Sequence, residues 1–312
     1  MTPQQIVQSG DVELAVYTWG TPGDKPTVVL VHGYPDCAAI WRATAARLAE
    51  RYHVIAYDVR GAGRSSRPQA VADYDLQFLV NDLAAVLDAT GPDQPVHLIG
   101  HDWGSIQCWE AVTTERLTGR IASFTSMSGP SLDHAGHWLR QRLRSGKPGQ
   151  LGQVARQFAH SWYVGMFHLP ALAPAVWKRG LGRRWPSLLE KIEGFRPEAS
   201  ATQIDDGRHG VKLYRANVAE RVLRPRQRRT DLPIQLIVPT RDKFMVGEIW
   251  DDLLQWAPKV WRRDLAAGHW LQLSHSDQVA DWATEFVDFI EGNTESAMLR
   301  QARLRPKLHG KS

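Results

Sequence analysis

The sequence predicts an α/β fold built on a mostly parallel, doubly wound sheet with an inserted helical cap. Short apolar runs alternate with stretches of helical periodicity, which is typical of strands and helices that follow one another along the chain. The runs are apolar at almost every position, which indicates strands that helices cover on both faces. Between about residues 130 and 230 the alternation stops, and Arg, Trp, Leu and Pro dominate without a convincing buried strand.

Six apolar runs are predicted as strands because they are short and bounded by turn residues. They are residues 27–31, 53–57, 96–99, 121–126, 234–238 and, more weakly, 260–265. We expect residues 10–19 to pair antiparallel at the sheet edge. Apolar residues at helical spacing predict helices at about residues 40–50, 76–90, 105–114, 248–256 and 277–291.

The length of 312 residues suits one large α/β domain with an insertion. We assign residues 1–130 and 231–295 to the core, 131–230 to the helical cap, and 296–312 to a basic tail or linker. A composition of 43% hydrophobic and 23% charged residues is enough to bury a full core and excludes a disordered chain. Two cysteines, Cys37 and Cys108, exclude a disulfide scaffold and a multi-cysteine metal site.

The net charge of +5 conceals a strong regional asymmetry. Residues 140–229 hold 19 Lys and Arg against 6 Asp and Glu, and residues 300–312 hold 5 basic residues and no acidic one. The remainder is acidic, with 14 basic and 27 acidic residues. A basic region of this size occurs in nucleic-acid binders and in solvated helical faces. Since no nucleic-acid-binding motif is present, we expect no nucleic-acid partner.

The chain carries no sign of a membrane span or a secretory signal. No run approaches the roughly 18 apolar residues that a spanning helix needs. The first residues lack a basic segment followed by an apolar one, so we expect a cytoplasmic location.

The third predicted strand runs into Gly100-His101-Asp102-Trp103-Gly104, and a helix follows. A Gly-x-nucleophile-x-Gly turn between a strand and a helix is a nucleophile elbow, in which glycines are needed because the neighbouring backbone is close. The nucleophile position holds Asp102 rather than Ser. An Asp at this place is by itself also a helix N-cap.

Two further residues support the catalytic interpretation of Asp102. Asp242 follows the fifth predicted strand, and His269 precedes the last predicted helix. Nucleophile, acid and histidine therefore occur in the order that this architecture uses. A helix cap or a structural loop histidine would explain either residue alone, but not the coincidence of all three with the strand pattern. Backbone N–H groups of Tyr34, in the turn after the first strand, and of Trp103 are the expected oxyanion-hole donors.

With these motifs the chain resembles the α/β-hydrolase family, and within it the aspartate-nucleophile branch of epoxide hydrolases and dehalogenases. The resemblance extends from residue 28 to about 291 and rests on HGYP, DVRGAGRSS, GHDWG, the Arg-Asp pair at 241–242 and AGHW. It implies that DVRGAGRSS is a structural turn, and this segment also lacks the Gly-Lys-Ser/Thr ending of a phosphate loop.

The resemblance implies a catalytic role for two tyrosines of the cap. Epoxide hydrolases hold the epoxide oxygen with two cap tyrosines, and the segments 161–170 (SWYVGMFHLP) and 210–217 (GVKLYRAN) look like the segments that carry them. Tyr163 and Tyr214 are therefore the candidates, with cap packing as the alternative for both. The implied reaction converts a lipophilic epoxide into a vicinal diol through an ester on Asp102, which water activated by His269 and Asp242 hydrolyses.

The resemblance calls for no metal and no organic cofactor. We expect the substrate pocket to include residues next to the motif positions, in the core turns and in the cap: His32, Pro35, His101, Trp162, Phe167 and Trp270. A homodimer, and a peripheral membrane contact through the basic cap or tail, are further partners to be tested.

Haloalkane dehalogenase is the leading alternative because it uses the same triad. It needs a second halide donor beside the Trp103 N–H, and the cap offers Trp138, Trp162, Trp177 and Trp185. A fluoroacetate-type dehalogenase would carry arginines after the nucleophile, where this chain has Trp103 and Gly104. A serine esterase is disfavoured because no GxSxG occurs. The intact triad disfavours a non-catalytic binding module.

The segment 123–136 and the basic carboxyl end also resemble the hydrolase half of fusions between an epoxide hydrolase and a short-chain dehydrogenase. No TGxxxGxG-type nucleotide loop occurs in the chain, so both a stand-alone relative and a part of such a fusion stay open.

Overall fold

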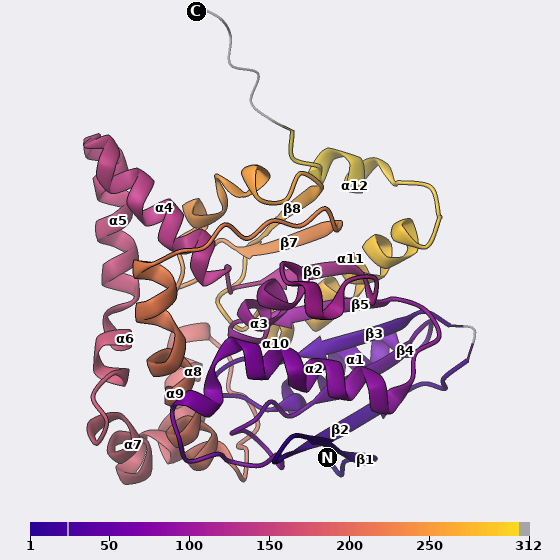
Figure 1. The fold of residues 1–312 in the computed structure, drawn as a ribbon, viewed down its shortest axis with the longest axis horizontal. Coiled ribbons are helices and arrows are strands. Elements are labelled where there is room, and N and C mark those ends of the chain that lie inside the picture. Colours follow the sequence, from indigo (N-terminus) through magenta and orange to yellow (C-terminus); the bar gives the residue numbers. More distant parts are fainter. Residues whose placement is uncertain (24, 306–312) are drawn as a thin grey trace, which may run out of the picture.

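A computed structural model of the protein describes residues 1–23 and 25–305 (Figure 1). Its centre is a sheet that has eight strands within these residues, in the order β1-β2-β4-β3-β5-β6-β7-β8. The edge strand β1 (Gln5–Ser9) pairs antiparallel with β2 (Val12–Trp19), and β2 pairs antiparallel with β4. All pairs from β4 to β8 along this order are parallel, as the apolar runs predict.

The parallel strands match the predicted runs closely. Their bounds are β3 (Thr27–Val31), β4 (His53–Tyr57), β5 (Val96–His101), β6 (Ile121–Met127), β7 (Ile234–Pro239) and β8 (Val260–Leu265). Every residue of β3, β4, β5 and β7 is buried. These strands need apolar side chains on both faces because helices cover both sides of the sheet.

The helices of the core divide between the two faces. On one face α2 (Leu76–Thr90) packs against α3 (Trp103–Val112), and on the other α1 (Arg42–Leu48) packs against α11 (Ser276–Ile290). A short helix, α10 (Leu271–Ser274), precedes α11. Each face has its own apolar cluster, so the sheet separates two halves of the core.

The helix predicted at residues 248–256 is instead a pair of short 3₁₀ turns, Gly247–Trp250 and Leu253–Gln255. Trp250, Leu253 and Trp256 are buried and spaced by three residues. A 3₁₀ helix has three residues per turn, so this spacing aligns them on one face. The same spacing also fits an α-helix, so the sequence pattern does not distinguish the two. The predicted α-helix was therefore wrong.

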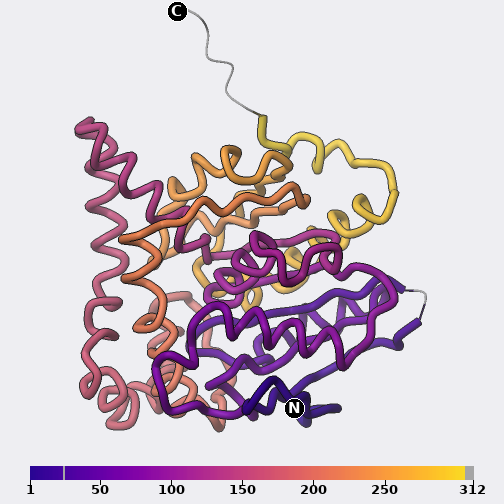
Figure 2. The backbone as a smooth tube through the Cα atoms, in the orientation of Figure 1, coloured from indigo at the N-terminus to yellow at the C-terminus, as the bar shows by residue number. Residues whose placement is uncertain are grey.

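The cap consists of the helices that lie between β6 and β7 in the sequence. They are α4 (Leu132–Ser145), α5 (Pro148–His160), α6 (Trp162–Phe167), α7 (Leu172–Val176), α8 (Gly182–Glu193) and α9 (Gln203–Leu223). Figures 1 and 2 show α4 to α7 as a column beside the sheet, with α8 and α9 between this column and the core. The cap therefore covers the carboxyl ends of the parallel strands.

The residues from 296 to 305 belong to the packed body, which corrects the expectation of a tail or linker for this part. Ser296 caps α12 (Ala297–Ala302) by accepting a hydrogen bond from the N–H of Leu299, whose side chain is fully buried. Leu299 fills a small apolar cluster with Trp261 and Phe286. The remaining tail residues, 306–312, lie outside the described part. Over the described residues, every helix is too short or too polar to cross a bilayer.

Candidate active site

Asp102 stands at a strained turn between β5 and α3. Its backbone has φ 52° and ψ −123°, a conformation that residues with a side chain rarely adopt. The turn fits because its neighbours are glycines: a Cβ on Gly104 would lie 2.1 Å from the carbonyl oxygen of Val31, and one on Gly100 would lie 2.7 Å from Cα of Ser105. This is the geometry of the predicted nucleophile elbow, and it presents the Asp102 carboxylate at the end of the sheet.

The turn after β3 contacts the Asp102 carboxylate directly. The backbone N–H of Tyr34 donates a hydrogen bond to Oδ1 of Asp102 over 2.7 Å. A Cβ on Gly33 would lie 2.4 Å from the same oxygen, so only glycine permits this approach. Trp103 is the first residue of α3, where backbone N–H groups have no partner within the helix. Both expected oxyanion donors therefore lie next to Asp102.

His269 is held between two carboxylates. Its Nδ1–H donates to Oδ2 of Asp242 over 2.8 Å, and its Nε2 lies 3.6 Å from Oδ2 of Asp102. The other Asp242 oxygen accepts the backbone N–H groups of Phe244 and Met245. The structure thus brings together Asp102, Asp242 and His269, which are far apart in the sequence.

The charges of this group shift two pKa values in opposite directions. Burial would raise the pKa of Asp242, but the positive charge of His269 and the hydrogen bonds it receives hold it below its usual range. Burial would lower the pKa of His269, but the Asp242 carboxylate and the contact with Asp102 raise it to about 10. At neutral pH the group therefore contains an imidazolium.

The two predicted tyrosines come from different cap helices and meet above Asp102. Tyr163 on α6 and Tyr214 on α9 have ring centroids 6.0 Å apart, and the ring of Tyr214 lies 4.8 Å from that of Trp103. The pKa of Tyr163 is raised by burial and then by the negative charge of Asp102. The pKa of Tyr214 is raised well above its usual value by burial, then by Tyr163 and Asp102. Both phenols therefore stay protonated, and the charge of the same carboxylate contributes to the raised pKa of each.

The loop that carries His269 contacts three side chains that no sequence motif marks. Glu193, the last residue of α8 in the cap, accepts the backbone N–H groups of His269 and Trp270 at 3.3 and 3.4 Å. Phe244 packs its ring 4.9 Å from that of His269. Asp36 accepts the indole N–H of Trp270 over 2.8 Å, and burial raises the pKa of Asp36 to about 7. No local motif marks these residues, because each acts through a contact with a distant segment.

Among the predicted pocket residues, Phe167 and Trp270 lie in the aromatic wall of the site. Phe167 has its ring 4.9 Å from that of Tyr214, and Trp270 has its ring 4.7 Å from that of His269. His101 instead lies behind the site, where its Nε2–H donates to the backbone oxygen of His269. Burial and the charge of His269 lower the pKa of His101 to about 4, so it remains neutral.

Trp162 was wrongly expected in the pocket. Its side chain is 70% exposed and points away from the core, although Tyr163 beside it faces the site. Successive helical residues project about 100° apart, so neighbours on α6 cannot share one face.

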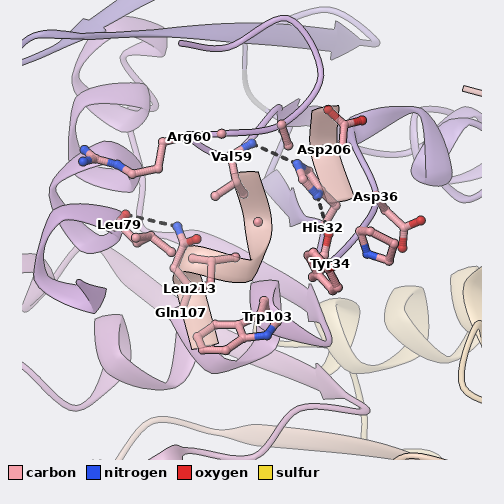
Figure 3. A pocket seen from close by; sticks show the side chains of 15 residues that line it. His32, Tyr34, Asp36, Val59, Arg60, Leu79, Trp103, Gln107, Asp206 and Leu213 are labelled. Atoms are coloured by element: carbon pink, nitrogen blue, oxygen red, sulfur yellow. Dashed lines mark hydrogen bonds between the residues drawn. The ribbon is translucent and has the colours of Figure 1, made fainter. Parts of the chain in front are cut away.

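His32 and Pro35 line a pocket next to the turn that carries Tyr34 (Figure 3). His32 accepts the N–H of Val59 in this pocket, as Figure 3 shows. The backbone oxygen of Pro35 accepts a hydrogen bond from the side-chain amide of Gln203 on α9. Tyr34 and Trp103 also line it, but Asp102 does not. His32 and Pro35 therefore support the turn that carries Tyr34. Over the described residues, no cluster of three or more His, Cys, Asp or Glu is arranged to hold a metal ion.

The sequence matches known proteins over most of its length. A family model described as the alpha/beta hydrolase fold matches residues 26–276. A Mycobacterium tuberculosis protein named "Probable oxidoreductase EphD" is 36% identical over 314 residues, which cover 97% of this chain and 52% of that protein. Epoxide hydrolase A of the same species is 34% identical over 195 residues, which cover 62% of this chain and 55% of that protein. The chain spans about half the length of the curated relatives it matches.

Solved structures of epoxide hydrolases have the same fold. The Bacillus megaterium epoxide hydrolase in complex with an inhibitor superposes with a TM-score of 0.76 at 22% identity, over 91% of this chain and 100% of that chain. The Vigna radiata epoxide hydrolase VrEH1 has a TM-score of 0.72 at 19% identity, over 91% and 97%. At these identities the likeness establishes the fold.

Proposed function

We propose that this chain, which belongs to the α/β-hydrolase fold family, is an enzyme that hydrolyses a lipophilic epoxide to a vicinal diol through a covalent ester on Asp102. One observation carries this proposal. The Asp102 carboxylate lies 3.6 Å from Nε2 of His269, which is paired with Asp242, and its charge also acts on the buried phenols of Tyr163 and Tyr214. The first arrangement suits ester hydrolysis, and the second suits protonation of an oxygen that leaves a ring carbon.

The first step joins the substrate to the enzyme. The hydrogen bond from Tyr34 fixes Oδ1 of Asp102, which leaves Oδ2 as the attacking oxygen. Oδ2 forms a bond to a ring carbon while the carbon–oxygen bond of the epoxide breaks. A tyrosine hydroxyl hydrogen-bonds the ring oxygen and gives it a proton, so that the oxygen becomes a hydroxyl group. The products are an alkyl ester of Asp102 and a tyrosinate.

The second step needs His269 as a base, and the ester makes it one. In the free enzyme the charge of Asp102 contributes to the raised pKa of His269. The ester is neutral, so its formation removes that contribution and lowers the pKa of His269. The imidazolium then returns a proton to the tyrosinate, directly or through solvent. The neutral ring is oriented by Asp242 and ready to activate water.

Hydrolysis breaks the acyl–oxygen bond of the ester. His269 takes one proton from water, and the hydroxide attacks Cγ of Asp102. The N–H groups of Tyr34 and Trp103 are placed to stabilise the negative oxygen of the tetrahedral intermediate. When the intermediate collapses, the alkoxide leaves with the second proton of the water. The diol departs, and the ionised carboxylate and the imidazolium are restored.

The walls of the site support a lipophilic substrate. Aromatic rings surround the carboxylate on the core and cap sides, and they offer apolar surface rather than charges: Tyr34, Trp103, Phe167, Phe244 and Trp270. The names of the epoxide hydrolase relatives support the same substrate class. EphD is named an oxidoreductase, but that name applies to a protein about twice as long as the matched region.

Haloalkane dehalogenation is the second candidate function, because a buried indole N–H in the cap is the type of group that binds the leaving halide. Trp138 donates to the backbone oxygen of Glu248, and Trp162 is exposed, so neither is placed to bind a halide. The buried indole N–H of Trp185 has no hydrogen-bond partner among the described residues, and that of Trp177 makes no full hydrogen bond but lies close enough to the Tyr34 hydroxyl to lower the pKa of Tyr34. Trp177 packs edge-on against Tyr34, with ring centroids 5.9 Å apart.

One comparison of substrates distinguishes these two functions. The purified protein is given styrene oxide and, separately, a bromoalkane of similar size, and diol and bromide are measured. Diol formation that Asp102→Ala abolishes, without bromide release, supports the epoxide hydrolase. Bromide release without diol formation would replace it with the dehalogenase.

A further inference from the structure

The outer edge of the cap carries an exposed apolar stripe. We use the name outer stripe for the large side chains that α5, α6 and α7 and their junctions turn to solvent: Leu151, Phe158, Trp162, Leu169 and Leu172. Phe158 is 61% exposed and Trp162 is 70% exposed. Leu151 and Phe158 are seven residues apart on α5, so they lie on the same side of that helix. The other three follow on α6, at the junction after it and at the start of α7. Figures 1 and 2 show this part of the chain as the edge farthest from the sheet.

The outer stripe is not explained by the packing of the cap. The opposite side of these helices already faces inward, where Val154 and Phe167 are buried and Tyr163 faces the site. Eleven large hydrophobic side chains are exposed in the described chain, and six of them lie between residues 143 and 172. Clustering of this kind marks an interaction surface, whereas isolated exposed hydrophobic residues are ordinary.

Within residues 144–184, the segment that contains the outer stripe, every charged side chain is basic. From residue 148 to 177 the sequence has one charged side chain, Arg156, which forms an ion pair with Glu248. Basic residues flank this stretch on both sides, and all of them are exposed: Arg144, Lys147, Lys178, Arg179, Arg183 and Arg184. None of the six forms an ion pair with another described residue, so their charges are available to a partner.

We propose that the outer stripe and its basic flanks dock on an anionic lipid surface. Apolar side chains on one side of a helix can enter the boundary between headgroups and acyl chains, and tryptophan favours that depth. Each basic residue near an anionic leaflet adds electrostatic attraction. Apolar residues bordered by cations are therefore complementary to acidic phospholipids.

The same charges disfavour a second copy of this chain as the occupant. A two-fold interface places the same patch of both subunits face to face. It would bring the unpaired cations of both copies together, and no acidic side chain lies within residues 144–184 to offset them.

Docking would place α6 between the lipid and the site. Trp162 points outward from this helix, and Tyr163 next to it faces the site. A lipophilic molecule dissolved in the bilayer would then meet the cap without crossing water. The docking surface itself does not depend on the reaction proposed for Asp102.

Cosedimentation with vesicles tests the proposal. The full chain is mixed with vesicles of phosphatidylcholine alone or of phosphatidylcholine with phosphatidylglycerol, at low and high salt. We expect binding to the anionic vesicles that weakens as salt rises, because exposed charges are screened. Binding to neither vesicle, or equal binding to both at every salt concentration, would overturn the proposal.

Paired variants identify the surface. Phe158→Ser with Trp162→Ser should lower the partition coefficient about tenfold or more, because the apolar area that enters the lipid is lost. Phe78→Ser with Met298→Ser removes exposed apolar side chains elsewhere, 44% and 68% exposed, and should leave the partition coefficient unchanged. All four substitutions are at exposed positions, so the melting temperature should stay within a few degrees and report an intact fold.

A second pair tests the charges. Arg179→Glu with Arg183→Glu should lower the partition coefficient about tenfold or more, whereas Arg116→Glu with Lys259→Glu makes the same charge change on the core and should not. Equal losses for both pairs would overturn the docking surface. A wild type that is dimeric by light scattering, with a monomeric stripe variant and no vesicle binding, would assign the outer stripe to self-association instead.

Discussion

The backbone N–H of Tyr34 donates to Oδ1 of Asp102 over 2.7 Å, and this contact gives the two carboxylate oxygens different surroundings. Oδ1 lies against the donor that will later serve the oxyanion, and Oδ2 lies 3.6 Å from Nε2 of His269. The carboxylate is thus oriented before a substrate arrives. Orientation of this kind contributes to catalysis because the reacting groups need not be ordered during the reaction.

Gly33→Ala should damage this contact. The new Cβ would lie 2.4 Å from Oδ1 of Asp102, so either the Tyr34 turn or the carboxylate must move. Loss of one oxyanion donor lowers rates about 100-fold to 1,000-fold in comparable sites, and we expect kcat/KM for an epoxide to fall by at least about 100-fold. Gly149→Ala is the control, since nothing lies within 4 Å of a Cβ there. A wild-type kcat/KM for Gly33→Ala would contradict the role of this turn.

Tyr163→Phe and Tyr214→Phe should each slow formation of the ester. Each substitution keeps the ring that packs against Phe167 and removes only the hydroxyl. A hydrogen bond to a developing charge contributes about 1.5–3 kcal/mol, which corresponds to a loss of roughly 10-fold to 100-fold in the alkylation rate constant. The double variant should be slower than either single one. Rapid-quench detection of the ester measures the rate constant, and an unchanged value in both single variants would remove the tyrosines from the mechanism.

Glu193→Gln should slow hydrolysis of the ester more than its formation. Glu193 accepts the N–H groups of His269 and Trp270 and so positions the base from the cap. Gln keeps one acceptor oxygen, so we expect a loss of about tenfold in the hydrolysis rate constant, and a larger loss for Glu193→Ala. The steady-state fraction of esterified enzyme should therefore rise. Glu190→Gln is the control, because this carboxylate lies on the same helix and pairs with exposed Arg196.

If Glu193 only stabilised the cap, its variants would lower the melting temperature and slow both steps equally. The ratio of the two rate constants separates this outcome from a positioning role.

The raised pKa of His269 predicts that stability falls with pH on the alkaline side. This pKa is about 10 in the folded protein, where burial is outweighed by Asp242 and Asp102, against about 6.5 in an unfolded chain. Between these values the folded protein keeps a proton that the unfolded chain has lost. The free energy of unfolding therefore declines as the pH rises through this window. Urea unfolding should show a steeper decline for wild type than for His269→Gln, and parallel declines would contradict the raised pKa.

Much of the fold could be predicted because its signals are local. An apolar run bounded by turns defines β3 or β4 without reference to other segments. The elbow at Asp102 is likewise a strand, a turn and a helix in one short segment. Asp242 and His269 could be located because each follows a strand and the carboxyl ends of parallel strands meet at one edge of the sheet.

What could not be predicted depends on which way a side chain points or on contacts between distant segments. Trp162 and His101 adjoin Tyr163 and Asp102 in the sequence, but adjacent residues on a helix or strand project in different directions. Glu193 reaches His269 across 76 residues, and no spacing in the sequence marks that contact.

Single turnover in H₂¹⁸O tests the ester on Asp102 most directly. Enzyme in excess over an epoxide is allowed to react once, and the peptide that contains Asp102 and the diol are then analysed by mass spectrometry. Because water attacks Cγ of Asp102, we expect one ¹⁸O in the Asp102 carboxylate and none in the diol of the first turnover. Label in the diol with an unlabelled Asp102 would show that water attacks the substrate itself and that no ester forms on Asp102.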